Sequence, residues 1–99
     1  MRLVLRRAAK LDLAEARRWY EEQKPRLGQE FHAAIDAALA LIREFPLIAP
    51  RVGPGVRRAR PKRFPYGIFY IVDGSTIRIL AILRNGRSSS WWKDRLDEQ

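Results

Sequence analysis

The side chains with the most chemical potential are three arginines that bracket a hydrophobic stretch late in the chain. Arg63 precedes this stretch, and Arg84 and Arg87 follow it. Guanidinium groups stabilise negative charge in an anion or a transition state, but they keep their protons and make poor bases. Lys62 could act as a base only if neighbouring cations lowered its pKa by several units. These residue types predict an anion-binding site, with Lys62, Arg63, Arg84 and Arg87 as weak candidates for catalysis.

Other proton donors and acceptors are few. Tyr66 and Tyr70 could donate protons, but the alternation of a strand places both on one face, where packing is the commoner use. His32 is the only histidine, and it falls on the flank of a predicted helix, away from the arginines. Residues 88–90 are serines without a His or Asp at a spacing typical of a catalytic triad. We therefore expect no nucleophilic catalysis.

A predicted β-hairpin brings the arginines together. Residues 63–87 contain two strands rich in aromatic and β-branched residues, joined at Asp73, Gly74 and Ser75, which are typical of a tight turn. In antiparallel neighbours, the start of one strand and the end of the next lie at the same edge of the sheet. A short strand over 56–61 adds more cations, with no acidic residue among them. We call the expected cluster the basic rim: Arg57, Arg58, Arg60, Arg63, Arg84 and Arg87.

The rim has two interpretations. Runs of charge are often only solvated surface, with no partner. In the other interpretation, cations from three separate segments meet an anion, and contact with nucleic acid would make binding strongly dependent on salt. Trp91 and Trp92 would then stack on bases or anchor a protein contact, unless the tail folds back to cover the sheet.

The first half of the chain predicts an edge strand followed by two helices. Residues 2–6 alternate as in a half-buried strand, and helical spacing follows over 8–24 and 27–45. Each helix has one apolar stripe, so the two should form an antiparallel hairpin that packs on a sheet. Leu11 and Trp19 lie off the first stripe, either as ordinary surface residues or as a partner-binding surface. The second stripe consists of Leu27, Phe31, Ala34, Ile35, Ala38, Leu41, Ile42 and Phe45.

These elements predict an α+β fold in the order β-α-α-β-β-β, with an antiparallel sheet packed against the N-terminal helical hairpin. Residues 46–55 contain too many Pro and Gly for regular structure and are predicted to form a loop. The length of 99 residues suits one domain over 1–99, in which 88–99 form a flexible tail or a helical turn.

Composition narrows the function classes. The net charge of +9 and the pI near 11.0 favour an anionic partner, whether nucleic acid, an acidic protein or a membrane surface. No apolar run is long enough to span a bilayer, so we expect a cytoplasmic protein. The chain has no cysteine, and no phosphate-binding loop, dinucleotide fingerprint or cluster of metal ligands occurs, so we expect no cofactor and no metal.

The order of elements and a set of residues along nearly the whole chain resemble the RelE/ParE superfamily of toxins from type II toxin–antitoxin pairs, and more narrowly its ParE branch. The segment FPYGIFY, after a helical hairpin and before a second hydrophobic strand, is its most characteristic part. The resemblance is carried by Ala9, Asp12, Leu13, Trp19, Tyr20, Phe31, Ile35, Pro46, Pro50, Gly55, Val56, Arg57, Arg58, Phe64, Pro65, Tyr66, Ile68, Tyr70, Val72, Ile77, Ile79, Leu80, Ile82, Arg84 and Arg87.

The resemblance implies one of two activities. RelE-like toxins cleave mRNA on the ribosome, which requires a proton acceptor for the attacking 2′-hydroxyl. ParE-like toxins inhibit DNA gyrase by protein contact. Many proteins of the RelE/ParE superfamily have a histidine at the end of the last strand, where this chain has Arg84, which does not accept a proton. The resemblance therefore favours the gyrase inhibitor over the mRNA endonuclease.

The resemblance also implies a partner. A toxin of this kind is neutralised in a hetero-oligomer by a cognate antitoxin, whose acidic C-terminal segment folds along it. Such a segment would neutralise the basic rim and cover Leu11 and Trp19. The alternative outside the toxin class is a basic nucleic-acid-binding module without an antitoxin, and a neighbouring reading frame for a short acidic protein would distinguish the two.

Overall fold

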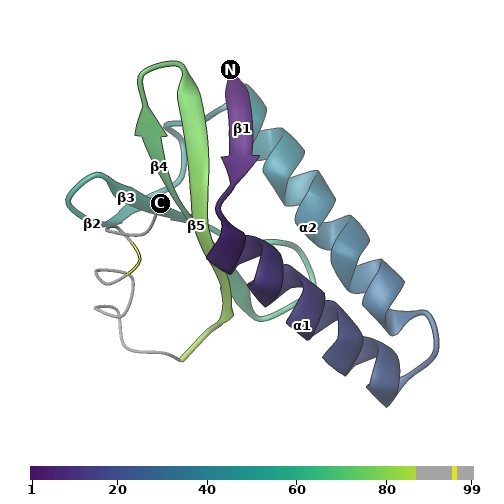
Figure 1. Cartoon of the computed structure of the whole chain (residues 1–99). Coiled ribbons are helices and arrows are strands. Elements are labelled where there is room, and N and C mark those ends of the chain that lie inside the picture. Colours follow the sequence, from purple (N-terminus) through teal and green to yellow (C-terminus); the bar gives the residue numbers. More distant parts are fainter. Residues whose placement is uncertain (87–94, 96–99) are drawn as a thin grey trace.

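A computed structural model describes residues 1–86 and Arg95. Within residues 1–86, two helices and five strands follow one another in the order β-α-α-β-β-β-β (Figure 1). The elements are β1 (Arg2–Leu5), α1 (Arg7–Gln23), α2 (Leu27–Glu44), β2 (Arg51–Gly53), β3 (Val56–Ala59), β4 (Tyr66–Asp73) and β5 (Thr76–Arg84). The predicted α+β class and the predicted helical hairpin are confirmed. Arg87, Trp91, Trp92 and the rest of the predicted tail, apart from Arg95, lie outside the described residues.

The two helices are held antiparallel by a short connection with its own polar anchor. The Glu21 carboxylate accepts hydrogen bonds from the backbone N–H groups of Arg26, at 2.9 Å, and Gly28, at 3.0 Å. A Cβ atom at Gly28 would lie 2.5 Å from the carbonyl oxygen of Arg17 in α1. Only glycine allows this approach, so Gly28 determines how closely the start of α2 packs on α1.

The sheet differs from the prediction in two respects. Its strand order is β1-β5-β4-β3-β2, and β1 pairs with β5 in parallel, so the sheet is mixed and not purely antiparallel. Residues 51–53, which were expected to belong to a loop, form β2 because they pair with β3. The predicted hairpin is confirmed: Asp73 pairs with Thr76, and Gly74 has a φ of +61° in the turn between β4 and β5.

The helical hairpin covers one face of the sheet, and aromatic rings fill the contact. Tyr20 of α1 stacks on Phe31 of α2, with ring centroids 5.0 Å apart, and both contact the rings of Phe64 and Tyr66. Ile35 of α2 is fully buried nearby. Such aromatic contacts contribute about 0.5–1.5 kcal/mol each beyond the burial of their area.

Not all of the predicted α2 stripe is in the core. Phe31, Ile35 and Ile42 are buried, whereas Leu41 is 56% exposed and Phe45 is 47% exposed. Inclusion of Leu41 and Phe45 among the stripe residues that pack on the sheet was therefore wrong, because Leu41 lies on an exposed face of α2 and Phe45 follows the last residue of the helix.

The central strands are apolar on both sides. Tyr66, Ile68 and Tyr70 of β4 pack in the cluster under the helices, and Phe69 packs with Leu80 in a second cluster on the opposite face. The run of consecutive buried residues in β4 is explained by this burial on two faces.

We expect Phe31→Ala to lower the free energy of unfolding by about 3–5 kcal/mol, because it leaves a cavity among the three rings that Phe31 contacts. Leu11→Ala is the control, since Leu11 is 59% exposed, and we expect a change within about 0.5 kcal/mol. Urea denaturation followed by circular dichroism measures both. Equal losses in the two variants would contradict the assignment of the core.

The buried phenol of Tyr70 predicts weaker stability in alkali. Its hydroxyl donates to the carbonyl oxygen of Pro46 at 2.8 Å, and burial raises its pKa, partly opposed by Arg57. A proton held more tightly in the folded protein makes stability fall as the pH rises above the unfolded pKa of about 10. Tyr70→Phe should cost about 0.5–1.5 kcal/mol at neutral pH and flatten this alkaline loss. Urea denaturation at a series of pH values tests this, and an unchanged alkaline slope would contradict it.

Candidate functional site

The last residues of β5 have an open edge that α1 covers. β1 pairs with β5 only from Thr76 to Ile79, so residues 80–84 extend beyond it. Asp12, near the start of α1, accepts a hydrogen bond from the backbone N–H of Ile82 at 3.0 Å. A side chain thus replaces the missing strand at this position.

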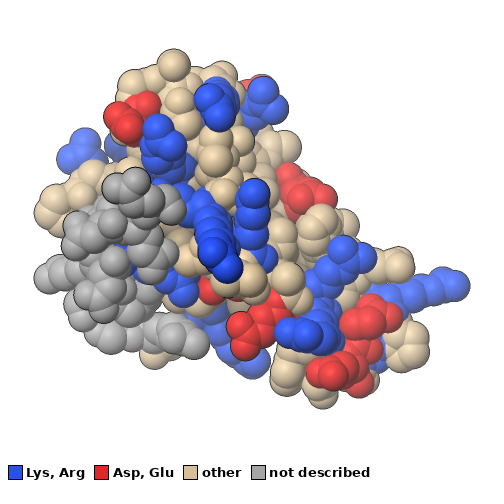
Figure 2. All heavy atoms as spheres, in the orientation of Figure 1, with Lys and Arg blue, Asp and Glu red and all other residues tan. Residues whose placement is uncertain are grey.

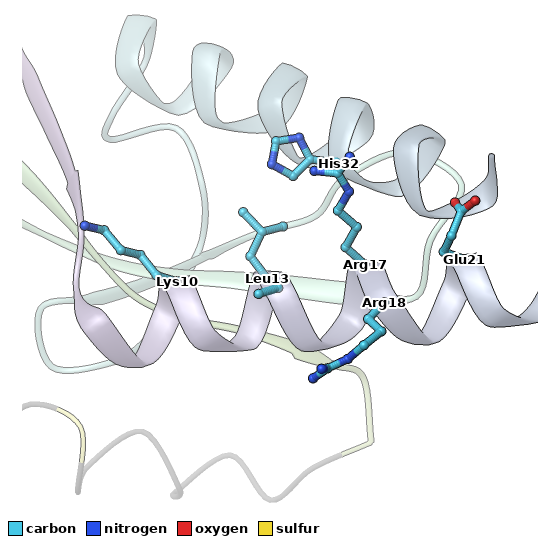
Figure 3. A pocket seen from close by; sticks show the side chains of 7 residues that line it. Lys10, Leu13, Arg17, Arg18, Glu21 and His32 are labelled. Carbon is cyan, nitrogen blue, oxygen red and sulfur yellow. The ribbon is translucent and has the colours of Figure 1, made fainter. Parts of the chain in front are cut away.

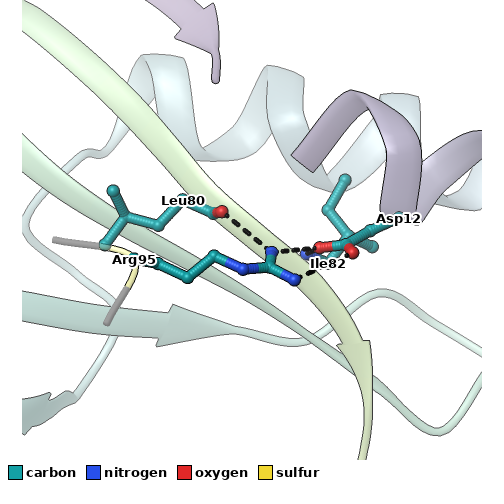
Figure 4. Close-up of polar contacts among 4 residues, drawn as sticks. All are labelled: Asp12, Leu80, Ile82 and Arg95. Atoms are coloured by element: carbon teal, nitrogen blue, oxygen red, sulfur yellow. Dashed lines mark hydrogen bonds and ion pairs between the residues drawn. The ribbon is translucent and has the colours of Figure 1, made fainter. Parts of the chain in front are cut away.

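Arg95 completes this contact from the C-terminal part of the chain. Its guanidinium donates to the two carboxylate oxygens of Asp12 at 2.7 and 3.3 Å and to the carbonyl oxygen of Leu80 at 3.3 Å (Figure 4). The side chains of Asp12 and Arg95 are only 10% and 22% exposed. In return, the backbone carbonyl of Arg95 accepts a hydrogen bond from Arg6. The contact joins α1, β5 and the C-terminal part of the chain.

A groove of about 400 Å³ runs between α1 and β5, and we call it the α1–β5 groove. One end is ionic, with Asp12 and Arg95, and the other end contains Trp19 and Arg84. The lining residues are Asp12, Glu15, Ala16, Trp19, Tyr66, Ile82, Leu83, Arg84 and Arg95.

Trp19 and Arg84 were both predicted to bind a partner, and the structure brings them together. The guanidinium carbon of Arg84 lies 5.7 Å from the centroid of the Trp19 ring, within the range of a cation–π contact. Trp19 is 45% exposed and packs edge-on against Tyr20, with ring centroids 5.0 Å apart. Tryptophan and arginine are the residue types enriched among the energetically dominant positions of protein interfaces.

Tyr66 lines the groove, and its pKa determines whether it can donate or accept a proton. Burial raises the pKa of its hydroxyl, as do the proximity of Tyr20 and a side-chain hydrogen bond with it, while Arg84 opposes the shift. Tyr66 therefore keeps its proton at neutral pH and can donate a hydrogen bond but not act as a base. The carboxylate of Asp12 is already bonded to Ile82 and Arg95.

The basic rim is only partly present. Tyr66 pairs with Arg84, so the start of β4 and the end of β5 share an edge, as expected. Their arginines nevertheless separate. Arg63 lies before β4 with a φ of +75°, and its guanidinium is 3.0 Å from the Glu30 carboxylate of α2. Arg84, by contrast, contacts Trp19 of α1.

Arg57 and Arg58 lie on opposite faces of the sheet, because successive strand residues alternate. Arg57 is opposite Tyr70 on the helix-covered face and donates to the carbonyl oxygens of Leu47, at 2.8 Å, and Ala49, at 2.7 Å. Arg58 is opposite Phe69, and its stem covers Gly67 closely. A single rim formed by all these arginines was therefore a wrong prediction.

The remaining predicted residues are dispersed. Arg60 and Lys62 line a different groove, beside α2. Leu11 is exposed on α1 but does not line the α1–β5 groove with Trp19. On the face shown in Figure 2, basic side chains lie over the sheet and over the helices, with acidic side chains among them. Arg87, Trp91 and Trp92 fall outside the described residues.

A second groove, of about 430 Å³, lies on the outer side of the helical hairpin. Leu13 and Ala14 contribute apolar surface, and the side chains of Arg17 and His32 approach each other from the two helices (Figure 3). The other lining residues are Lys10, Arg18 and Glu21. His32 lies on the surface of α2, away from the α1–β5 groove, as predicted, and its Nδ1 atom is 3.3 Å from the Asp36 carboxylate. Within residues 1–86 and Arg95, no three His, Asp or Glu side chains are grouped to hold a metal, and none of the helices there is long and apolar enough to cross a membrane.

Sequence reasoning missed the role of Asp12 and Arg95. Asp12 was noted only as part of a resemblance, although its spacing of four from Ala16 and seven from Trp19 puts all three on one face of α1. Such a carboxylate at the margin of an apolar stripe is a usable signal for a polar anchor. Arg95 had no comparable signal, because 83 residues separate it from Asp12.

We expect Asp12→Asn to lower the free energy of unfolding by about 1.5–3 kcal/mol, since the charged hydrogen bonds between Arg95 and the carboxylate are lost. Arg95→Met and the double variant complete a cycle that isolates the pair. The matched control is the exposed pair of Asp73 and Arg78, 3.4 Å apart, where the same cycle should give at most about 1 kcal/mol. Coupling no larger than in the control would show that Arg95 does not hold Asp12 in solution.

Comparisons with known proteins agree with this architecture. Residues 3–88 match the model of the ParE toxin of the type II toxin–antitoxin system parDE. A solved chain from a structure described as the chromosomal ParDE TA system from P. aeruginosa is similar, with a TM-score of 0.64 and 26% sequence identity over 85% of this chain and 95% of that one. None of the curated proteins compared with the chain matches it. The family match covers most of the chain, which therefore belongs to the ParE toxin family of type II toxin–antitoxin systems and has an antitoxin as its partner.

Proposed function

We propose that this toxin inhibits DNA gyrase by protein contact through the α1–β5 groove, and that an acidic segment of the antitoxin neutralises it. The observation that carries the proposal is the pair of Trp19 and Arg84. A half-exposed indole with a guanidinium over its ring offers both an apolar surface and a fixed positive charge. The proposal places the toxin in the cytoplasm, together with its target.

Protein contact accounts for the groove better than RNA cleavage does. Attack by a 2′-hydroxyl on the adjacent phosphate needs a group that accepts its proton. In the α1–β5 groove Tyr66 holds its own proton. Arg84 stands at the end of the last strand, where the superfamily that the sequence resembles often has a histidine. Arginine stabilises charge but does not accept a proton at neutral pH. Its position over Trp19 suits recognition of a carboxylate on a partner.

The charge of the chain supports an acidic antitoxin segment. The net charge is +9. Several of the exposed cations lie in the segment from Arg51 to Arg63, which contains no acidic residue. An acidic chain would be attracted from a distance and would associate faster at low salt. This argument concerns the partner, and it is independent of the target.

The test compares the wild type with Arg84→Glu in two assays. One measures DNA supercoiling by purified gyrase, and the other follows intact mRNA on translating ribosomes. We expect the wild type to inhibit supercoiling and to leave mRNA intact. The same inhibition should require at least about tenfold more of the Arg84→Glu variant, because the variant loses one charge pair at the interface. Arg51→Glu is the control, because Arg51 is an exposed arginine on the edge strand β2 and the charge change is the same.

Three outcomes would contradict the proposal. Cleaved mRNA with normal supercoiling would assign the chain to the RelE-like activity. If Arg84→Glu and Arg51→Glu weakened the inhibition of gyrase equally, the inhibition would depend on the total charge of the protein and not on the α1–β5 groove. Normal supercoiling with intact mRNA would exclude gyrase as the target.

A further inference from the structure

The groove of about 430 Å³ on the outer side of the helical hairpin has no part in the proposed function, and we call it the outer groove. Five of its seven lining residues are Lys10, Leu13, Ala14, Arg17 and His32. The α1 residues of the outer groove lie on the opposite side of that helix from the α1 residues of the α1–β5 groove. A ligand in the outer groove would therefore leave the α1–β5 groove free.

Arg17 has no counterion among the described residues, although the sequence offers one. Glu21 follows it by four residues, a spacing that allows ion pairs on a helix. Both oxygens of the Glu21 carboxylate are used instead at the connection between the helices, where they accept hydrogen bonds from the N–H groups of Arg26 and Gly28. None of the ion pairs in the described part of the chain includes Arg17. Its guanidinium is therefore available to an anion from outside the chain.

His32 approaches this guanidinium from α2 (Figure 3). Its Nδ1 atom lies 3.3 Å from the Asp36 carboxylate, so Nε2 is the ring nitrogen left for a ligand. A protonated imidazole donates from both nitrogens, which makes Nε2 a second donor beside Arg17. Two cations that approach each other repel, and an anion between them turns this repulsion into attraction. Arg17 and His32 thus form the head of an anion site.

The head suits a carboxylate better than a phosphate ester. One guanidinium and one imidazole N–H match the two oxygens of a carboxylate. A phosphate ester has three free oxygens and nearly two negative charges near neutral pH, which two donor groups satisfy less completely. Lys10 and Arg18 do not add to the head, because their side chains point away from Arg17 and His32 in Figure 3.

The rest of the outer groove suits an apolar group. Leu13 and Ala14 contribute apolar surface between the head and Lys10, and the seven residues from Lys10 to Arg17 span about 10 Å of helix. The volume of about 430 Å³ is typical of sites for small organic molecules. A nucleic acid would instead place further phosphates over Leu13 and Ala14, where these apolar side chains offer no donor.

We propose that the outer groove binds a small amphipathic carboxylate, with the carboxylate between Arg17 and His32 and an apolar body over Leu13 and Ala14. Neither gyrase nor the antitoxin takes part in this binding. The proposal therefore stands or falls separately from the proposed function.

The head makes the expected affinity depend on pH. A carboxylate beside an imidazole favours the charged ring, so binding takes up a proton and tightens as the pH falls. Histidine ordinarily changes charge between about pH 5 and 8, whereas carboxylates, guanidinium groups and lysine ammonium groups ordinarily do not. The charged groups near His32 are all of these latter types: Asp36 on its own helix, and Lys10, Arg17, Arg18 and Glu21 on α1.

The test titrates the full chain with 4-phenylbutanoate, which has a carboxylate at the end of an apolar chain and ring. Ligand-observed NMR measures the affinity, and the shifts of the protein amides locate the site. The alcohol 4-phenylbutanol has the same body without the charge, and acetate has the charge without the body. We expect 4-phenylbutanoate to bind at least about tenfold more tightly than either, with the largest shifts near Leu13 and Arg17.

Three variants test the head, and circular dichroism checks that each one folds. Arg17→Gln should weaken binding at least about fivefold, because a charged hydrogen bond is lost. Arg51→Gln is the matched control, since it removes an exposed arginine elsewhere, and should change the affinity less than about twofold. The wild type should bind at least about threefold more tightly at about pH 5.5 than at about pH 8, and His32→Gln should bind equally at both.

Four results would overturn the proposal. The first is no binding of 4-phenylbutanoate, or binding no tighter than that of the alcohol or acetate. The second is a set of amide shifts centred on Trp19 and Ile82, which would place the ligand in the α1–β5 groove. The third is equal weakening by Arg17→Gln and Arg51→Gln, which would make total charge the cause. The fourth is an affinity of the wild type that does not change with pH, which would remove His32 from the head.

Discussion

The β4–β5 hairpin is buried on both faces, and this constraint determines where the protein can interact with other molecules. Ile68 and Tyr70 pack under the helices, while Phe69 and Leu80 pack in the opposite cluster. No residue in the middle of these strands is available to a partner. Recognition is therefore left to the ends of the strands, where Arg84 emerges, and to the outer faces of the helices.

The edge of β5 that extends beyond β1 is completed by a side chain and not by another strand. A parallel β1 of four residues cannot cover a strand of nine. The N–H of Ile82 would be left without a partner if Asp12 did not accept its hydrogen bond. The carboxylate in turn is nearly buried and is neutralised by Arg95. The position of α1 beside β5, and with it the position of Trp19, follows from this chain of polar contacts.

Much of the fold could be predicted from local patterns, because period and turn chemistry act over a few residues. The helices over 7–23 and 27–44 and the turn at Gly74 are such cases. β2 could not be predicted, since the three residues between Pro50 and Pro54 become a strand only by pairing with β3. The parallel pairing of β1 with β5 likewise could not be predicted. It depends on how the helical hairpin places the later strands beside β1, and no local sequence pattern indicates this.

The candidate site was predictable only in part, for electrostatic reasons. The alternation of β3 was available from the sequence and separates Arg57 from Arg58. The hydrogen bonds that arginine side chains donate to backbone oxygens could not be predicted from the sequence. Arg57 is bonded to Leu47 and Ala49, and Arg43 donates to the carbonyl oxygen of Met1 at 2.9 Å. Counting charges thus overstates the positive surface that a partner can meet.

Of the cations predicted for the site, the exposed ones that the structure describes lie in two places beside the helical hairpin. Arg84 lies beside α1, and Arg60, Lys62 and Arg63 lie beside α2. Both places combine positive charge with exposed apolar surface, from Trp19 in one and from Leu41 in the other. A partner with carboxylates alone would gain little from either, because exposed ion pairs contribute at most about 1 kcal/mol each. We therefore expect this protein to prefer partners that present apolar side chains and carboxylates together.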